Sequence, residues 1–418
     1  MSETALQILD AFGDPTSPGE WSFAARHLGN AEFAEIANAA RAHGKVLERD
    51  GLALFALGTA IRLVTQNGFA TPGAATGVLD ALRAVTTTQV DHPGARPLAL
   101  GALPFDRESA AELSVPSVVA IEHEHRRVLL VVARPDELTE LLESPGGALQ
   151  PTDSDSAPPD HFELTSVQSH ERFKELVAEA VAAIADGEFQ KVVVAREVEV
   201  QGNRPFAPRD LLGRLRALYP SCVTFSLDNF VGASPELLCR TNDSTVTSHP
   251  LAGTIARSGD PEEDERLAKG LLASPKERSE HGIVVKAIVA GLEGLAANVS
   301  ASPSPHLLEL RNVVHLATTI TGELAEPRPG ALQVAMALHP TPAVGGWPRD
   351  RALSWLENHE KLERDRYAGP LGFMDANGDG EWWLGIRSAL MDGTSSRLLA
   401  GVGSSPTPCP LPSSPRPS

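Results

Sequence analysis

The sequence predicts an α/β (α+β) fold, and three observations lead to this class. Runs rich in Val, Leu, Ile and Phe, each bounded by turn residues, recur between residues 50 and 145 and are typical of strands. Apolar positions at helical spacing follow in HERFKELVAEAVAAIADGEF. A chain of 418 residues that is 42% hydrophobic can bury a large core. Strands and helices therefore alternate in one folded chain.

The early strands are expected in LALFALG, PLALGALPF, PSVVAIEH and RRVLLVVAR. The stretch SPGGALQPTDSDSAPPD, residues 144–160, is dense in Pro, Gly, Ser and Asp and reads as a linker or a long loop. We therefore divide the chain near residue 150, with residues 1–150 as an N-terminal part of the fold and residues 165–403 as its core.

Helices are expected over HERFKELVAEAVAAIADGEF, ending at Gly187, and from Pro261 to about Leu295, whose acidic start PEEDE suits a helix N-terminus. The strand KVVVAREVEV lies between them. DANGDG, residues 375–380, begins like a calcium loop, but its twelfth position is Ile386 instead of a bidentate Glu. It is predicted to be a hairpin turn.

The charge and the cysteines restrict the function classes. A formal charge of −18 disfavours a nucleic-acid surface, although one local basic pocket would still accept a small anion. Cys222, Cys239 and Cys409 are too few for a disulfide framework or a Cys-based zinc site. The acidic N-terminus does not resemble a signal peptide, and no apolar run approaches the roughly eighteen residues of a membrane span. We expect a cytoplasmic monomer with no nucleic-acid or membrane partner.

Several residues could carry chemistry. Lys191 opens an apolar strand; such a lysine is usually solvated, but burial would turn it into a general base. Glu236 follows a predicted Gly-Ala-Ser-Pro turn and precedes apolar residues. Desolvation there would favour its protonated form, although an exposed turn glutamate is an equally good interpretation. Glu277 and Glu280, three residues apart, could share a helix face and support Mg²⁺, although a solvated face is the commoner case. Arg387 within an apolar run usually pairs with a carboxylate or a ligand.

Eight segments occur in a fixed order within residues 165–403. They are KVVVAR, FVGASPELL, PLAGT, SPKERSEH, LRNVVHLATTITG, HPTPAVGG, RDRYAGPLGF and GDGEWWLGIRSA. Together they resemble the chorismate-utilising enzymes, a family that includes anthranilate, aminodeoxychorismate, isochorismate and salicylate synthases. GALPFD and LSVP, further upstream, resemble the N-terminal half of isochorismate synthases.

The resemblance implies an anthranilate synthase component I/ADC synthase-like fold of two facing β-sheets flanked by helices. It also implies chorismate as the substrate and Mg²⁺ as the cofactor. Lys191 would activate water for attack at C2 of chorismate, Glu236 would protonate the departing C4 hydroxyl, and Glu280 would hold the metal. The residues implied to bind the substrate, with Tyr367 and Arg387 on its enolpyruvyl carboxylate, are Gly253, Thr254, His315, Ala343, Tyr367, Arg387, Gly401 and Gly403.

Three features select among the members of the family. Lys191 favours water over ammonia as the nucleophile, Ala252 stands where aminodeoxychorismate synthase has a lysine, and HPTPAVGG is most similar to isochorismate synthases. Isochorismate synthase is therefore the leading expectation and salicylate synthase the alternative, with anthranilate synthase a distant third.

The C-terminal segment departs from the family pattern. Family members continue past LLAGVG with a segment like IVADS and a helix that supplies a second Mg²⁺ ligand, whereas this chain reads SSPTPCPLPSSPRPS over residues 404–418. With suitable codons, one inserted base ahead of Ser404 changes the reading to IVADSVPPAELAETE, which places a glutamate where Arg416 stands. We hypothesise a frameshift, and we expect a disordered tail with impaired activity or, as an alternative, a catalytically dead homologue that binds chorismate.

Overall fold

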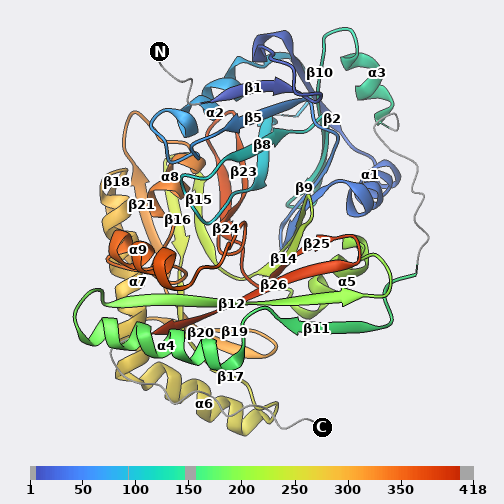
Figure 1. Cartoon of the computed structure of the whole chain (residues 1–418). Coiled ribbons are helices and arrows are strands. Elements are labelled where there is room, and N and C mark those ends of the chain that lie inside the picture. Colours follow the sequence, from blue (N-terminus) through green and yellow to red (C-terminus); the bar gives the residue numbers. More distant parts are fainter. Residues whose placement is uncertain (1–5, 93, 146–156, 405–418) are drawn as a thin grey trace.

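The architecture consists of two large β-sheets that face each other, with helices on their outer sides and at one end (Figure 1). It is given by a computed structural model, which describes residues 6–92, 94–145 and 157–404. The expected α/β class with two facing sheets is confirmed.

The first large sheet has ten strands among the described residues. In spatial order, the strands are β1 (Gln7–Asp10), β5 (Ile61–Thr65), β8 (Ala111–Val115), β7 (Leu98–Ala102), β23 (Pro370–Asp375), β24 (Gly380–Leu384), β15 (Leu237–Asn242), β16 (Thr245–His249), β21 (Ile320–Leu324) and β18 (Ala296–Ala301). Its fourth and fifth strands, β7 and β23, pair a strand from before residue 150 with one from the C-terminal part of the chain.

The second large sheet is built in the same mixed way. Its strands, in spatial order, are β11 (Phe162–Ser166), β12 (Lys191–Gly202), β26 (Ser395–Ser404), β25 (Ser388–Asp392), β14 (Phe230–Ser234), β13 (Val223–Leu227), β3 (Lys45–Arg49), β4 (Leu52–Leu57), β9 (Val118–His123), β10 (Arg126–Ala133), β2 (Ser22–His27) and β6 (Thr86–Val90). The short β22 (Gly346–Trp347) also pairs with β12. Because both sheets contain strands from either side of residue 150, the two parts of the chain share one core.

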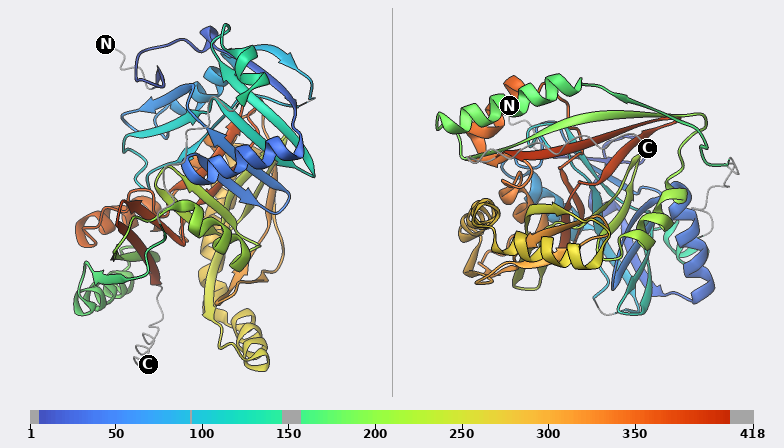
Figure 2. Two further views of the ribbon diagram at one scale, coloured as in Figure 1. Left: turned by 90° about the vertical axis from the view of Figure 1, so that its right-hand side faces the viewer. Right: turned by 90° about the horizontal axis from the view of Figure 1, so that it is seen from below.

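A small third sheet and the helices complete the fold. The sheet contains β17 (Leu251–Ala256), β20 (Val313–Ala317) and β19 (His306–Glu309). The helices are α1 (Asn30–His43), α2 (Ala74–Ala84), α3 (Leu138–Glu143), α4 (His170–Ala185), α5 (Pro208–Leu218), α6 (Pro261–Ala273), α7 (Pro275–Glu293), α8 (Ala331–Leu338) and α9 (Arg349–His359), with a 3₁₀ turn η1 (Pro18–Glu20). α4 covers β12, and α7 packs on β17 and β18. Figure 2 shows α4 and α6 flanking the lower end of the molecule on opposite sides.

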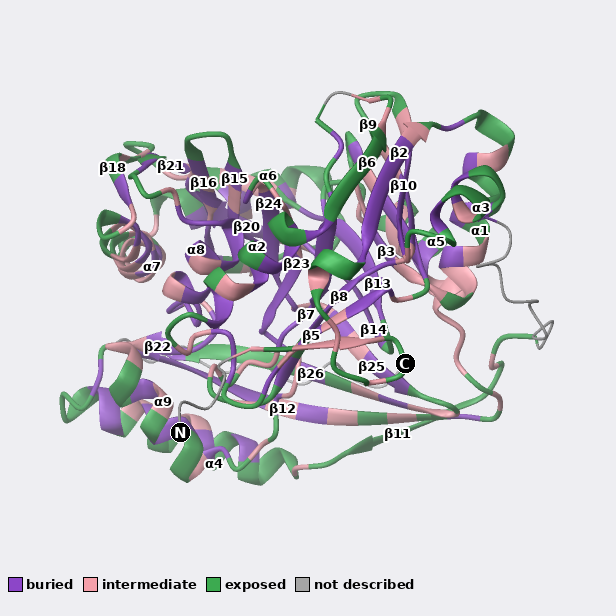
Figure 3. Ribbon diagram, turned by 90° about the horizontal axis from the view of Figure 1, so that it is seen from above, coloured by how far each residue is buried: buried purple, intermediate pink, exposed green. Residues whose placement is uncertain are grey.

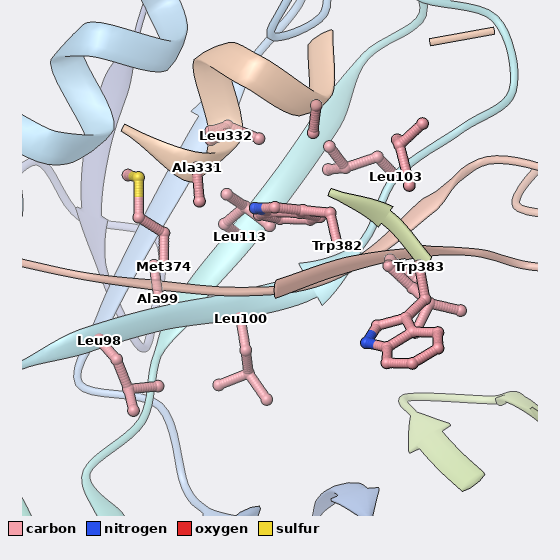
Figure 4. Packing of buried hydrophobic residues seen from close by; sticks show 14 of the residues in the cluster. Leu98, Ala99, Leu100, Leu103, Leu113, Ala331, Leu332, Met374, Trp382 and Trp383 are labelled. Atoms are coloured by element: carbon pink, nitrogen blue, oxygen red, sulfur yellow. The ribbon is translucent and has the colours of Figure 1, made fainter. Parts of the chain in front are cut away.

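One apolar core joins the two large sheets. Its buried side chains come from strands of both sheets and from α2 and α8. Figure 4 shows Trp382 and Met374 packed among Leu113, Ala331 and Leu332. Strands β13 and β14 are buried throughout, whereas the edge strand β11 is exposed along its length (Figure 3). The core therefore forms where the sheets face each other, and the edges meet solvent.

Most of the predicted elements are present. The four early strands correspond to β4, β7, β9 and β10, and the first long helix is α4, followed by Gly187 with φ +78°. DANGDG joins β23 to β24 as a hairpin turn, as predicted. No helix in the described ranges is long and apolar enough to span a membrane.

The structure corrects three local expectations. The helix predicted from Pro261 to about Leu295 is two helices, α6 and α7, because Ser274 is extended (ψ 117°) and caps α7 before Pro275. FVGAS is a buried strand instead of a turn. Arg387 lies between β24 and β25, at φ +52°, and does not sit inside one continuous strand.

The linker expected over residues 144–160 and the tail expected from residue 404 fall largely outside the described ranges. Ser404 itself is the last residue of β26 and is buried opposite Val192. Cys222 and Cys239 are buried free thiols, and Cys409 lies outside the described residues.

Candidate active site

Lys191 is a buried lysine at the first position of β12. Lys191 is 2% exposed, so the expectation that it is a solvated lysine at a strand end is wrong. Its backbone pairs with Trp347 of β22, and the next residue, Val192, pairs with Ser404 of β26. Lys191 is thus held between the loop before β22 and the end of β26.

An ion pair connects Lys191 to helix α7. The Nζ atom of Lys191 lies 3.0 Å from Oε1 of Glu280, whose side chain is 14% exposed. A Cβ atom placed on Gly403 would lie 3.0 Å from the same Oε1 and 3.7 Å from Cε of Lys191. Gly403 is therefore the residue whose lack of a side chain leaves space for this ion pair.

A second carboxylate, Glu277, lies one helical turn before Glu280. Burial and the charge of Glu280 raise the pKa of Glu277, while Lys276, Lys191 and the backbone N–H of Thr254 oppose the rise. A Cβ atom on Gly253, which has φ +77°, would lie 3.2 Å from Oε2 of Glu277. Two carboxylates that repel each other in a half-buried position suit a hard cation. No group of three or more His, Cys, Asp or Glu that could hold a metal occurs within the described residues.

Glu236 lies between β14 and β15 and is 4% exposed. Burial raises its pKa to about 7, although the Leu251 N–H and the charges of Lys191 and Arg387 act to lower it. The Leu251 N–H donates to Oε1 of Glu236 over 3.4 Å. Glu236 can therefore exchange a proton near neutral pH, and the charge of Lys191 affects its pKa.

Thr254, His315 and Arg387 form a hydrogen-bonded chain. His315 Nδ1 lies 2.8 Å from Oγ1 of Thr254, and His315 Nε2 lies 2.6 Å from Nη2 of Arg387. Burial and the charge of Arg387 lower the pKa of His315 to about 4. A guanidinium only donates, so the neutral ring accepts at Nε2 and carries its proton on Nδ1. The Thr254 hydroxyl then accepts from His315 and keeps its own proton for another acceptor.

Arg387 also has a free donor. Its Nη1 is buried and has no hydrogen-bond partner among the described residues. Nearly all buried polar groups in proteins are satisfied, so an orphan guanidinium nitrogen indicates a place for an anionic ligand. Arg387 and Glu236 interact electrostatically, as do Arg387 and Tyr367.

Tyr367 is 8% exposed, and burial raises its pKa. A Cβ atom on Gly401 would lie 3.1 Å from its hydroxyl. Gly401 pairs with Ala195 of β12, so the Tyr367 hydroxyl lies beside the strand that begins at Lys191. Ala343 is half-buried in the loop before β22, and its N–H lies 3.3 Å from Oγ1 of Thr341.

The expected residues thus form two linked groups. Lys191, Glu280 and Gly403 touch at one point, while Thr254, His315 and Arg387 form the second group, and the charges of Lys191 and Arg387 both reach Glu236. Among the described residues, Ala343 has no hydrogen bond to either group.

The motifs assign no role to His281, although the structure places it at the site. It is 3% exposed, its Nε2 lies 2.7 Å from Oγ1 of Thr318, and burial together with the charge of Lys191 lowers its pKa to about 4. Its only sequence signal is its position directly after Glu280.

The site combines a buried lysine and a buried glutamate, two neighbouring carboxylates, and an arginine with an unsatisfied buried donor. This combination is typical of an enzyme site for a small anionic substrate. Residues 33–404 match the model of the chorismate binding enzyme family, and the chain belongs to that family.

Within this family, the chain is similar to several isochorismate synthases. The isochorismate synthase DhbC of Bacillus subtilis is 34% identical over 74% of this chain and 75% of its own length. The salicylate biosynthesis isochorismate synthase of Pseudomonas aeruginosa is 40% identical over 57% of this chain, and the match spans half of that relative. A solved structure assigned as the isochorismate synthase DhbC of Bacillus anthracis superposes with a TM-score of 0.75 at 30% identity, over 90% of this chain and 93% of that one.

Proposed function

We propose that this chain is an isochorismate synthase, which converts chorismate to isochorismate. The observation that carries the proposal is the burial of both Lys191 and Glu236 within reach of each other's charge, with burial raising the pKa of Glu236 to about 7, so that it can give up a proton near neutral pH. The isochorismate synthase DhbC of Bacillus subtilis, which supports this assignment, aligns with 74% of the chain.

The proposed reaction adds one water and releases another. The Lys191 amine takes a proton from a water molecule, whose oxygen forms a bond to C2 of chorismate. The ring double bonds shift and the C4–O bond breaks, while Glu236 gives its proton to the departing hydroxyl, which leaves as water. The product is an isomer of the substrate. The two buried groups thus perform general base and general acid steps on opposite ends of the same rearrangement.

Arg387 and its partners would hold the substrate. The free Nη1 of Arg387 can donate to a carboxylate of chorismate, since its Nη2 is already fixed by His315. The Thr254 hydroxyl, which accepts from His315, can donate to the same ligand. The Tyr367 hydroxyl beside Gly401 offers a further donor. We propose that these groups fix the orientation of C2 and C4 relative to Lys191 and Glu236.

We propose Mg²⁺ as the cofactor, held by Glu280 with Glu277 beside it. The mutual repulsion of these carboxylates supports the fit, and Mg²⁺ is commonly bound through one or two carboxylates together with substrate oxygens. When bound, the ion would neutralise the ring carboxylate of the substrate. For Lys191 to accept a proton, its amine must be neutral and released from the ion pair with Glu280.

Product analysis tests the function. The chain is incubated with chorismate and Mg²⁺, and isochorismate is the expected product. Salicylate with pyruvate would support the alternative of a salicylate synthase, and anthranilate formed with ammonia would exclude both. Chorismate binding without any product would identify a catalytically dead homologue. Lys191→Ala is the matched control and should lose the activity by about 10²–10⁴-fold.

The names of two similar proteins indicate two pathways that could use the product. The relatives include a vibriobactin-specific isochorismate synthase of Vibrio cholerae, 31% identical, and a menaquinone-specific structure of Escherichia coli, 23% identical. We propose siderophore or menaquinone synthesis as the destination, in the cytoplasm and with a monomeric enzyme. Size-exclusion chromatography with light scattering measures the oligomeric state.

A further inference from the structure

A bidentate ion pair is buried close to the site but outside every motif role given above. Nε and Nη2 of Arg364 each lie 2.7 Å from one carboxylate oxygen of Glu360, and the two side chains are 4% and 3% exposed. Glu360 follows the end of α9, and Arg364 lies four residues later. Removing two charges from water is costly unless further hydrogen bonds satisfy them, so the remaining partners of the pair show what it holds.

The first partner is the backbone of β12. The Ala195 N–H donates to Oε2 of Glu360 over 2.8 Å, and Nη2 of Arg364 donates to the Val193 carbonyl over 2.6 Å. β22 pairs with β12 only at Lys191 and Val192. Beyond β22, Glu360 and Arg364 therefore form the hydrogen bonds to the Ala195 N–H and the Val193 carbonyl that a neighbouring strand would otherwise form.

The second partner is the loop before β22. Nη1 of Arg364 donates to the Val344 carbonyl over 2.8 Å, and the next residue, Gly345, accepts from the Val193 N–H over 2.9 Å. The guanidinium also lies over the ring of Phe105, 4.4 Å from its centroid. The loop that contains Ala343 is thereby tied to the strand that begins with Lys191.

The third connection runs through the chain itself. The Tyr367 N–H donates to the Arg364 carbonyl over 2.9 Å, so Arg364 and Tyr367 form one turn. Three segments of the chain, which carry Lys191, Ala343 and Tyr367, therefore converge on one buried ion pair.

We propose that Glu360 and Arg364 are positioning residues, which hold the start of β12, the 339–346 loop and the Tyr367 turn in the geometry that catalysis needs. The proposal rests on the proposed function for its kinetic consequence. The pair does not touch the substrate; it acts by fixing where the amine of Lys191 and the hydroxyl of Tyr367 lie. Small displacements of such groups strongly reduce turnover.

The test compares a neutral replacement of this pair with a control elsewhere. The double variant E360Q/R364M leaves no unpaired buried charge and preserves side-chain volume, so it is the version expected to fold. The control is E381Q. Glu381 is also a buried carboxylate, but it lies on β24 and binds the side chains of Arg49, Arg240 and Trp383, none of which belongs to β12 or the 339–346 loop. R364K, which keeps the charge but not the forked geometry, completes the set.

Two readouts are measured on the full chain. With chorismate, E360Q/R364M and R364K should lower kcat by about 10–100-fold with a smaller change in KM, whereas E381Q should lower Tm and leave kcat within about twofold. Amide hydrogen exchange should be at least about tenfold faster at residues 193–195 and 344–346 in the double variant, and unchanged there in E381Q.

Hydrogen exchange needs no substrate, so it decides the positioning role even if the wild-type chain forms no isochorismate. Unaltered protection at residues 193–195 and 344–346 in both R364K and the double variant would overturn the proposal. Unaltered kcat in variants with faster local exchange would also overturn it, because the segments would then move without consequence for catalysis. If the double variant fails to fold, R364K carries both measurements.

Discussion

Arg387 and His315 are joined by a hydrogen bond of 2.6 Å from Nη2 to Nε2, and this contact determines which atom of the imidazole carries the proton. Because the guanidinium cannot accept, the His315 ring is neutral and donates through Nδ1 to Thr254. Burial keeps the ring neutral, since the pKa of His315 is lowered to about 4. One histidine thus sets the direction of the hydrogen bonds made by Thr254 and by Arg387.

Replacing His315 should separate these two contacts. His315→Asn retains an amide near the Nδ1 position but loses the acceptor for Arg387, and we expect KM for chorismate to rise by about tenfold or more. His315→Gln can still offer an acceptor near the Nε2 position, and it should show the smaller change. Steady-state kinetics on both variants provides the measurement. Equal effects would contradict an anchoring role for His315.

The activity should fall as the pH rises above about 7. In the proposed reaction Glu236 is the acid and must be protonated, and burial raises its pKa to about 7. The basic limb of the kcat/KM profile should therefore have its midpoint near pH 7. Glu236→Gln should lower kcat by about 10²–10⁴-fold, and its residual activity should lack this limb. The rival outcome is a wild-type profile that stays flat from pH 6 to about pH 9.

The same group should affect stability in the opposite sense to most carboxylates. Its folded pKa, about 7, lies above the ordinary value of 4.5, so the folded state holds an extra proton between these values. The free energy of unfolding should then decrease as pH rises through this window, by about 3 kcal/mol in total from this residue. Urea unfolding of Glu236→Gln should lack that decrease. A wild type and variant with parallel stability profiles would refute the assignment.

Gly403→Ala tests the space around the Lys191–Glu280 ion pair. The added Cβ would lie 3.0 Å from Oε1 of Glu280, so the carboxylate must shift. We expect Mg²⁺-dependent turnover to fall by about tenfold, with a higher Mg²⁺ concentration needed for half-maximal rate. Gly270→Ala is the control, because its Cβ in α6 would meet nothing within 4 Å, and it should stabilise the helix by about 0.5–1 kcal/mol. Full activity in Gly403→Ala would show that the ion pair tolerates displacement.

The C-terminal segment is tested by replacement. Substituting IVADSVPPAELAETE for residues 404–418 should raise Mg²⁺-dependent turnover strongly, because the frameshift hypothesis assigns a second metal ligand to that segment. Residues 405–418 lie outside the described structure, so the comparison of the two proteins in one assay decides the point. Equal activity would remove the hypothesis, and sequencing the gene around codon 404 gives an independent answer.

Local sequence patterns were sufficient for most elements, whereas the list of candidate site residues came from the resemblance to a family. Alternating apolar runs and helical spacing predict β4, β9, β10 and α4, because these periods depend only on which side chains are apolar. Ordered motifs point to Lys191 and Glu236 through their resemblance to a family. The prediction of one long helix from Pro261 to about Leu295 was wrong, because the extended Ser274 and the following Pro275 divide it into α6 and α7.

The sequence by itself determined the fold class, the family and the identity of the candidate residues, since each of these depends on residue type and order. Only the tertiary structure decided that Lys191 is buried against Glu280, that His315 directs Arg387, and that Glu360 and Arg364 join β12 to the 339–346 loop. The His315–Arg387 contact joins residues 72 positions apart, and Glu360 and Arg364 reach residues of β12 that lie 165 and 171 positions away in the chain. No local pattern records such contacts, because burial and charge pairing arise only when distant strands and helices pack together.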